Sequence, residues 1–135
     1  MIDPDLQFSV LCDDIRREDN GKLMFFGLFE AVRTTTMPCA HPKLCIANRW
    51  CNGMGEFEQQ TRLVTVDDEV LVEDRVTRFE LPGMGASHTV IAVFGGLRFE
   101  QEGHYSVEVL LNGNLKLRYP LVVEEIQEGG EEQMA

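Results

Sequence analysis

Basic residues are scarce in this sequence. It holds 12 Lys and Arg against 23 Asp and Glu, which gives a formal net charge of −11 over 135 residues. This excess of negative charge repels nucleic acids and anionic membrane surfaces over most of the protein. The sequence also lacks any apolar run near the ~20 residues that a membrane helix needs. We therefore expect neither a nucleic acid nor a membrane as a partner.

The first residues lack the features of a secretory signal, because no basic start leads into a long apolar stretch. No Cys-x-x-Cys pair is present either; the four cysteines are Cys12, Cys39, Cys45 and Cys51. In a reducing compartment such cysteines are free thiols. Together these absences predict a cytoplasmic protein without disulfides.

No stretch of the sequence keeps a helical period, and alternation with period two dominates between its glycines and prolines. This pattern predicts an all-β fold. We expect a two-layer antiparallel β-sandwich with an immunoglobulin-like Greek key of about seven to nine strands. Asn20-Gly21, between two apolar runs, is the strongest hairpin signal. The expected strands cover residues 6–14, 22–32, 43–51, 56–66, 70–80, 88–99, 104–111 and 115–124.

The last expected hairpin, on either side of residues 112–114, has the clearest alternation. One face of its first strand is apolar and begins at Tyr105, while the opposite face carries polar residues such as Glu108. Such alternation indicates that one face packs on a core and the other meets water. Pro120 has no amide hydrogen, so the last strand should be an edge or should interrupt its pairing there.

The composition changes near the C-terminus, where acidic residues and two glycines appear without any basic residue; the acids are Glu124, Glu125, Glu128, Glu131 and Glu132. A segment of this kind is typical of disorder, because its like charges repel and it has little apolar surface to bury. We expect residues 1–126 to form one β-sandwich domain and residues 127–135 to form an acidic, disordered tail.

A glycine and a tyrosine at the start of the 104–111 strand resemble a tyrosine corner. Leu97 lies on the preceding apolar strand, Gly103 at the corner and Tyr105 just after it. In such a corner the phenol bonds to the backbone a few residues upstream and fixes the crossover. An inward-facing Tyr105 without this bond is the alternative. Both interpretations are structural, and neither indicates an activity.

Several segments of the chain resemble a family of uncharacterised bacterial proteins. They are Leu11-Cys-Asp-Asp-Ile-Arg16, Asn20-Gly-Lys-Leu23, Phe26-Gly-Leu-Phe29, Phe99-Glu-Gln-Glu-Gly-His-Tyr105 and Pro120-Leu-Val-Val123. The resemblance covers the opening and the closing hairpin, and the middle, roughly 33–88, does not share it. It implies a β-sandwich of unknown function, and it assigns no site residues.

The sequence does not assemble a metal or catalytic site. Cys39, His41, Cys45 and Cys51 are close in sequence, but Cys45 and Cys51 are roughly 20 Å apart if one strand holds both. One tetrahedral zinc cannot bind two sulfurs at that distance. The acidic pairs and triplets, such as Asp67-Asp68-Glu69, are typical of solvated turns. We therefore predict no catalytic, cofactor-binding or metal-binding residues.

The expected strand 22–32 has an unusual excess of apolar residues, because both of its faces carry them. Met24, Phe26 and Leu28 lie on one face, and the opposite face is equally apolar. A two-layer sandwich buries only one face of a strand, so the other needs a cover. We take Met24, Phe26 and Leu28 as a candidate interface. Two internal covers are the alternatives: a lid from the 33–42 loop, or a β-bulge at Gly27 that shifts the phase of the strand.

These observations favour a non-enzymatic cytoplasmic protein-interaction or accessory domain, acting as a homo-oligomer or with a protein partner. The alternative is a small-ligand or metal-binding sandwich that uses a loop end. In that case Cys39, His41 and residues 67–69 are the candidate contributors. A hydrolase on a sandwich scaffold is a third and weaker interpretation.

Overall fold

The computed structural model describes residues 1–127, which contain β-strands and no helix. There are ten strands: β1 (Asp5–Arg17), β2 (Leu23–Phe29), β3 (Ala31–Thr34), β4 (Cys39–Cys51), β5 (Gly55–Val64), β6 (Val70–Glu73), β7 (Thr77–Leu81), β8 (Ser87–Phe99), β9 (Gly103–Leu111) and β10 (Asn114–Glu125). The predicted all-β fold is confirmed.

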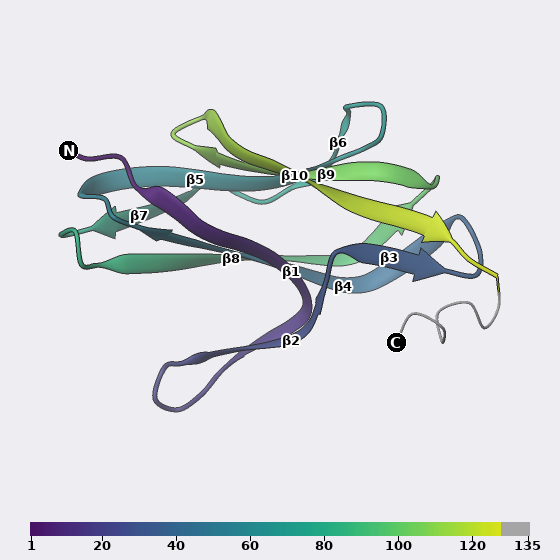
Figure 1. Ribbon diagram of the computed structural model, residues 1–135, viewed down its shortest axis with the longest axis horizontal. Coiled ribbons are helices and arrows are strands. Elements are labelled where there is room, and N and C mark those ends of the chain that lie inside the picture. Colours follow the sequence, from purple (N-terminus) through teal and green to yellow (C-terminus); the bar gives the residue numbers. More distant parts are fainter. Residues whose placement is uncertain (128–135) are drawn as a thin grey trace.

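The strands form two sheets that pack face to face (Figure 1). One sheet has four strands in the order β2-β1-β4-β8, and the other has six, in the order β3-β10-β9-β5-β6 with β7 also on β5. All pairs are antiparallel except β3 with β10, which is parallel. The two-layer sandwich is therefore confirmed, whereas the immunoglobulin-like Greek key stays a prediction.

Two expected strands each divide into two, which is why ten strands replace the predicted seven to nine. The 22–32 segment leaves the four-stranded sheet at Glu30 and continues as β3 in the other sheet. The 70–80 segment breaks after Glu73 into β6 and β7, which pair with different parts of β5. Neither Glu30 nor the stretch after Glu73 contains a glycine or proline, so the turn signals of the sequence do not reveal the breaks.

Aromatic side chains fill the space between the two sheets. Trp50 from β4 stacks on Phe79 from β7, with ring centroids 5.9 Å apart, and Phe57 lies 5.6 Å from the same ring. Asn48, Gln59 and Thr61 are also fully buried between the sheets, and their side chains bond to one another. This core holds β4, β5 and β7 together. Leu11 of β1 belongs to it and Phe29 of β2 packs against it, whereas the residues of the hairpin beyond these two lie outside it.

Pro120 lies where β10 loses its second neighbour. The strand pairs with β9 through this position, but β3 begins to pair with it only at Val122. Val122 and Ile126 donate backbone hydrogen bonds toward the β3 side, to Glu30 and Thr34. Backbone N–H groups alternate between the two sides of a strand, so residue 120 would direct its N–H to the same side as Val122. A proline has no N–H to place there. The predicted edge at Pro120 is thus observed.

The tail predicted over 127–135 lies, from residue 128 onward, outside the described residues. Within the described part of the chain, no helix is long and apolar enough to cross a membrane.

Candidate functional site

The β1–β2 hairpin extends beyond the outline of the two sheets (Figure 1). Its turn is set by Asn20 and Gly21, as the sequence predicted. Gly21 has a φ of +89°, and its amide donates to the carbonyl of Glu18 at 2.8 Å. The side chain of Asn20 accepts a hydrogen bond from the amide of Lys22 at 3.0 Å. This turn brings β2 back along β1 as the outermost strand of the four-stranded sheet.

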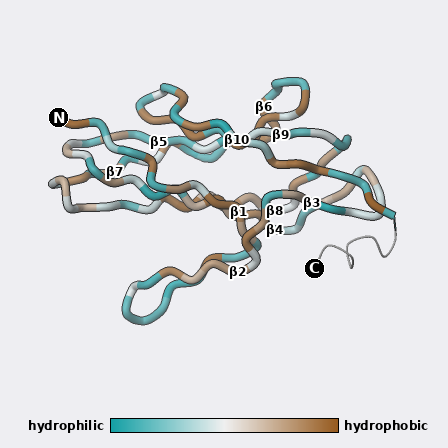
Figure 2. Tube along the Cα trace, viewed as in Figure 1, coloured by the Kyte–Doolittle hydropathy of each residue, from teal (hydrophilic) through white to brown (hydrophobic). Residues whose placement is uncertain are grey.

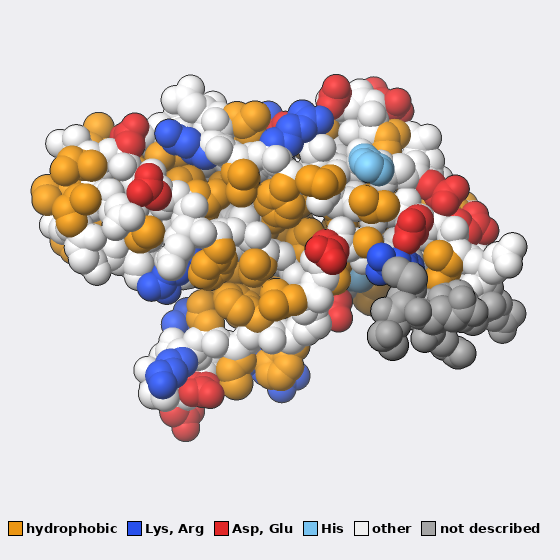
Figure 3. Space-filling model, in the orientation of Figure 1, with side chains coloured by type: hydrophobic (Ala, Val, Ile, Leu, Met, Phe, Trp, Pro, Cys, Tyr) orange, Lys and Arg blue, Asp and Glu red, His pale blue; other side chains and the backbone are white. Residues whose placement is uncertain are grey.

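β2 exposes large apolar side chains to solvent. Phe26 is 44% exposed and Leu28 is 62% exposed, whereas Met24 is half-buried. All seven residues of the strand are uncharged, and most appear in hydrophobic shades in Figure 2. Figure 3 shows hydrophobic side chains gathered on the hairpin and on the adjoining part of the body. The structure therefore leaves Phe26 and Leu28, two of the three predicted interface residues, exposed, although the guanidinium of Arg16 lies over the Phe26 ring, 5.3 Å from its centroid.

Neither internal cover is present. The 33–42 segment does not form a lid: it begins in β3, ends in β4, and places Met37 against the core. The β1–β2 register is the same on both sides of Gly27, since Phe26 faces Asp14 and Leu28 faces Cys12. The bulge alternative is thus wrong, because a bulge would shift one of these pairs relative to the other.

Gly27 nonetheless has a special conformation. Its φ is +68°, a value that residues with a Cβ rarely adopt. A Cβ at this position would also collide with the carboxylate of Asp13 on β1. Gly27 therefore lets the two strands stay close at the centre of the hairpin, without changing which face of β2 carries Phe26 and Leu28.

The outer edge of β2 carries unpaired backbone groups. At the end of the hairpin the amide of Glu18 donates to the carbonyl of Lys22. In an antiparallel ladder the bonded pairs alternate, so Met24, Phe26 and Leu28 bond toward β1. The backbone N–H and C=O groups of Leu23, Phe25 and Phe29 then point away from β1. No strand of the described chain pairs with that side.

The hairpin and the body enclose a groove of about 660 Å³. Phe8 and Phe25 meet there edge to face, with ring centroids 6.1 Å apart. The groove also holds an unusual share of the basic side chains of this acidic protein, namely Arg17, Lys22 and Arg49, together with His88. Leu23 and Phe25 are thus half-buried beside the body, whereas Phe26 and Leu28 are more exposed.

The three corner residues lie together at the other end of the sandwich. Tyr105 is 2% exposed, and its hydroxyl donates to the carbonyl of Gln101 at 2.7 Å. Gly103 has a φ of +140°, and a Cβ there would lie 2.5 Å from a side-chain carbon of Val66. Leu97 is buried in the core. The bond expected of a tyrosine corner is therefore present, and this end is rigid scaffold.

The residues of the ligand-binding alternative do not form one donor set. His41 lies 3.8 Å from Asp13 and packs against Phe29, whereas Cys39 packs against the core. The acids of the 65–69 turn are engaged elsewhere: Asp67 accepts from Gln101 and Asp68 from Arg118. Among residues 1–127, no three His, Cys, Asp or Glu side chains could hold one metal ion.

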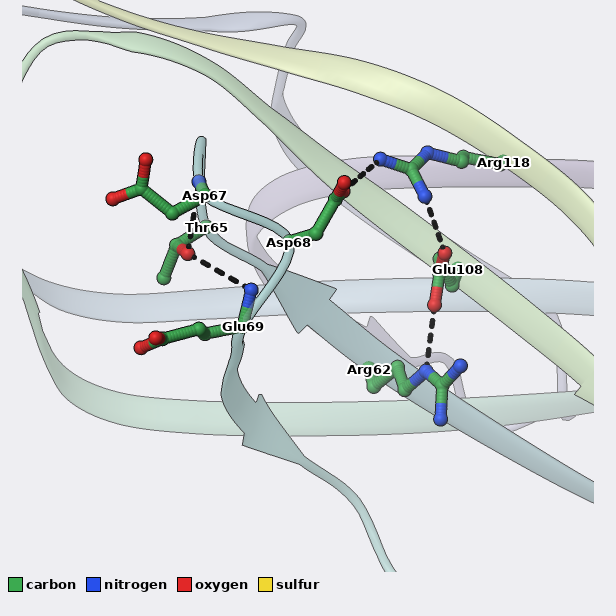
Figure 4. A network of polar contacts seen from close by, with 7 residues as sticks. All are labelled: Arg62, Thr65, Asp67, Asp68, Glu69, Glu108 and Arg118. Carbon is green, nitrogen blue, oxygen red and sulfur yellow. Dashed lines mark hydrogen bonds and ion pairs between the residues drawn. The ribbon is translucent and has the colours of Figure 1, made fainter.

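A buried carboxylate network on the outer face of the six-stranded sheet could not be read from the sequence. Glu108 lies on the face of β9 that alternation predicted to meet water, but it is only 4% exposed, because Arg62 and Arg118 cover it, at 2.6 and 2.9 Å. The prediction of a solvated face is therefore wrong at this residue. Arg118 also binds Asp68 at 2.8 Å and so fixes the β5–β6 turn over β10 (Figure 4). Each charge in this network has a partner, so its role is structural.

Cys12 and Cys45 face each other across β1 and β4, a pairing that spacing along the chain does not suggest. All four cysteines are free thiols. Burial raises the pKa of the Cys12 thiol to about 11, and it also raises the pKa of Cys45. Buried thiols with raised pKa values are poor nucleophiles, so this pair offers no catalytic centre.

Comparison with known proteins adds a family but no activity. A protein-family model, described as a family of unknown function (DUF6941), matches residues 7–124. This match covers nearly the whole sandwich, including the middle segment that the sequence resemblance left out. No curated protein matches the chain.

Proposed function

Because the chain belongs to this family of unknown function, we propose its role from the geometry: it is a non-enzymatic protein-interaction domain that binds through β2. One observation carries the proposal. β2 is an edge strand with unpaired backbone groups, and its exposed face carries Phe26 and Leu28. Exposed sheet edges with apolar side chains are templates for pairing with another chain.

The rest of the described surface supports an interaction role over a ligand-binding one. The residues of the ligand-binding alternative are spread over separate contacts, as described above, whereas β2 offers a contiguous apolar strand. The free thiols fit a reducing compartment, so we place the role in the cytoplasm as part of the same proposal.

Site-specific photo-crosslinking of the full chain in its producing cell tests the proposal. A benzophenone amino acid replaces Phe26 in one variant and Val76 in the control. Val76 suits as a control because it is also apolar and half exposed, at 50%, and lies outside β2. We expect a discrete adduct from position 26 that is absent from position 76 and is lost when Leu28→Glu is added. Equal labelling at both positions would overturn the proposal.

A further inference from the structure

β2 lacks the usual protection of an edge strand. Natural edges carry a lysine, a proline or a bulge that blocks pairing with another chain. β10 has such a device in Pro120, on the side that β3 leaves open. β2 has neither a charged residue nor a proline over its seven residues, and its register holds no bulge. The open part of β10 is thus protected, whereas the outer edge of β2 is not.

The occupant of this edge must itself be an extended strand with apolar side chains. The outward-pointing backbone groups belong to Leu23, Phe25 and Phe29, so an added strand would bond to alternate residues. Its side chains would meet apolar residues on both faces of β2. The partner must therefore be an extended strand that carries apolar residues on both of its faces.

β2 of a second copy is an extended strand of this kind, since its own residues are apolar on both faces. In an antiparallel pairing centred on Phe26, Leu23 faces Phe29, Met24 faces Leu28, and Phe25 faces Gly27. Leu23 and Phe29, whose backbone groups both point away from β1, then form a hydrogen-bonded pair, as these free groups require. An aromatic ring opposite a strand glycine also covers the backbone that the glycine exposes.

The same register brings opposite charges together at both ends. Lys22 and Glu30 flank β2, and both are exposed. Neither takes part in an ion pair among residues 1–127. The pairing centred on Phe26 places Lys22 opposite Glu30 of the second copy, twice by symmetry. A shift by two residues in either direction would place at least one of them opposite an apolar residue.

We propose that β2 pairs antiparallel with β2 of a second copy of this chain, in the register that places Lys22 opposite Glu30 of that copy. This inference rests on the proposed function and names its partner. The dimer has an isologous two-fold interface and joins the two four-stranded sheets into one continuous sheet. The interface is small, at the low end of specific contacts, so dimerisation is weak and depends on concentration.

Sedimentation of the purified full chain at about 0.15 M ionic strength tests the register. The variants are Lys22→Glu, Glu30→Lys and the double variant, each compared with wild type. We expect each single variant to dimerise roughly tenfold more weakly, because both of its ion pairs become like-charge contacts. The double variant returns to wild-type affinity. An equimolar mixture of the two single variants forms a heterodimer, because each copy then supplies the charges that the other needs.

Net charge provides the internal control. Glu30→Lys makes the chain less acidic and Lys22→Glu makes it more acidic, so general repulsion would move the two variants in opposite directions. Stronger dimerisation by Glu30→Lys would therefore overturn the proposed register. A monomeric wild type at high micromolar concentration would overturn self-pairing. In that case, an adduct of position 26 with a different protein would still support the proposed function.

Discussion

The hydroxyl of Tyr105 donates a hydrogen bond to the backbone carbonyl of Gln101, and the two oxygens are 2.7 Å apart. The ring of Tyr105 also meets Phe99 edge to face, with centroids 5.0 Å apart. Together these contacts tie the end of β8 to the start of β9. This end is therefore fixed from within the chain, whereas β2 of the β1–β2 hairpin has an unpaired outer edge.

Replacing Tyr105 with Phe should cost about 1 kcal/mol in the free energy of unfolding, because the Gln101 carbonyl loses its partner while the ring stays buried. Denaturant melts of the two proteins measure this difference. Tyr119→Phe is a matched control, since that hydroxyl bonds to the side chain of Ser9 instead of the backbone. Identical midpoints for Tyr105→Phe and wild type would contradict a stabilising corner.

The carboxylate of Asp14 should titrate at unusually low pH. Its Oδ1 lies 2.7 Å from the Lys43 ammonium and its Oδ2 lies 3.1 Å from Arg16. These contacts lower the pKa of Asp14 from 3.8 to about 2. Because the pKa of Asp14 is lower in the folded protein than in the unfolded chain, the charged carboxylate stabilises the fold at pH values above 3.8. This stabilisation is lost as the pH falls toward 2.

NMR titration of the Asp14 carboxyl carbon checks this pKa. Lys43→Met should raise the pKa toward 3.8, because it removes the strongest of the contacts that favour the charged form. Arg98→Met removes an exposed partner of Glu100 elsewhere and should leave Asp14 unchanged. A pKa near 3.8 in the wild type would contradict the ion pair with Lys43.

The thiols of Cys12 and Cys45 should resist alkylation in the native protein. Both are buried and have raised pKa values, whereas Cys51 is only half-buried. Mass spectrometry after brief iodoacetamide treatment should find Cys51 labelled first, because alkylation requires an accessible thiolate. All four cysteines should react once the chain is unfolded. Native labelling of Cys12 as fast as that of Cys51 would show that the sheet does not shield this pair.

Substitution of Phe26 by Glu should leave the fold intact. Phe26 is 44% exposed, so we expect a change in unfolding free energy within about 0.5 kcal/mol. Phe57→Glu, at a residue of the same type that is 2% exposed, should unfold the chain, because it buries a charge in the core. Thermal melts compare the two variants. An unfolded Phe26→Glu protein would place Phe26 in the core and contradict the exposed face.

Local patterns in the sequence predicted much of the fold. Alternation indicated the inward face of β9, Asn20-Gly21 indicated the first hairpin, and the Gly103–Tyr105 spacing predicted the bond to Gln101. On β10 the alternation was right only toward the end of the strand, because Leu115 and Leu117 are exposed. An exposed face of β2 was one of three alternatives that the sequence left open, because two apolar rows exceed what one sandwich core can cover. Each of these features depends on residues that are close in the chain.

Features that depend on pairing between distant strands were not predictable. Cys12 faces Cys45 because of the β1–β4 register, and Glu108 is buried because Arg62 and Arg118 reach it from neighbouring strands. A single sequence contains no signal for either register. The division of 22–32 into β2 and β3 was missed for the same reason, since β3 is defined by its parallel pairing with β10.

Hydrogen exchange at β2, followed by NMR as the protein concentration rises, tests the open edge most directly. In dilute protein, the amides of Phe25 and Phe29 should exchange far faster than those of Met24, Phe26 and Leu28, which bond toward β1. At high concentration the first group should gain protection, because the second copy supplies acceptors for these amides. Equal protection of both groups in dilute protein would contradict the account, since the chain itself would then already pair the outer edge of β2.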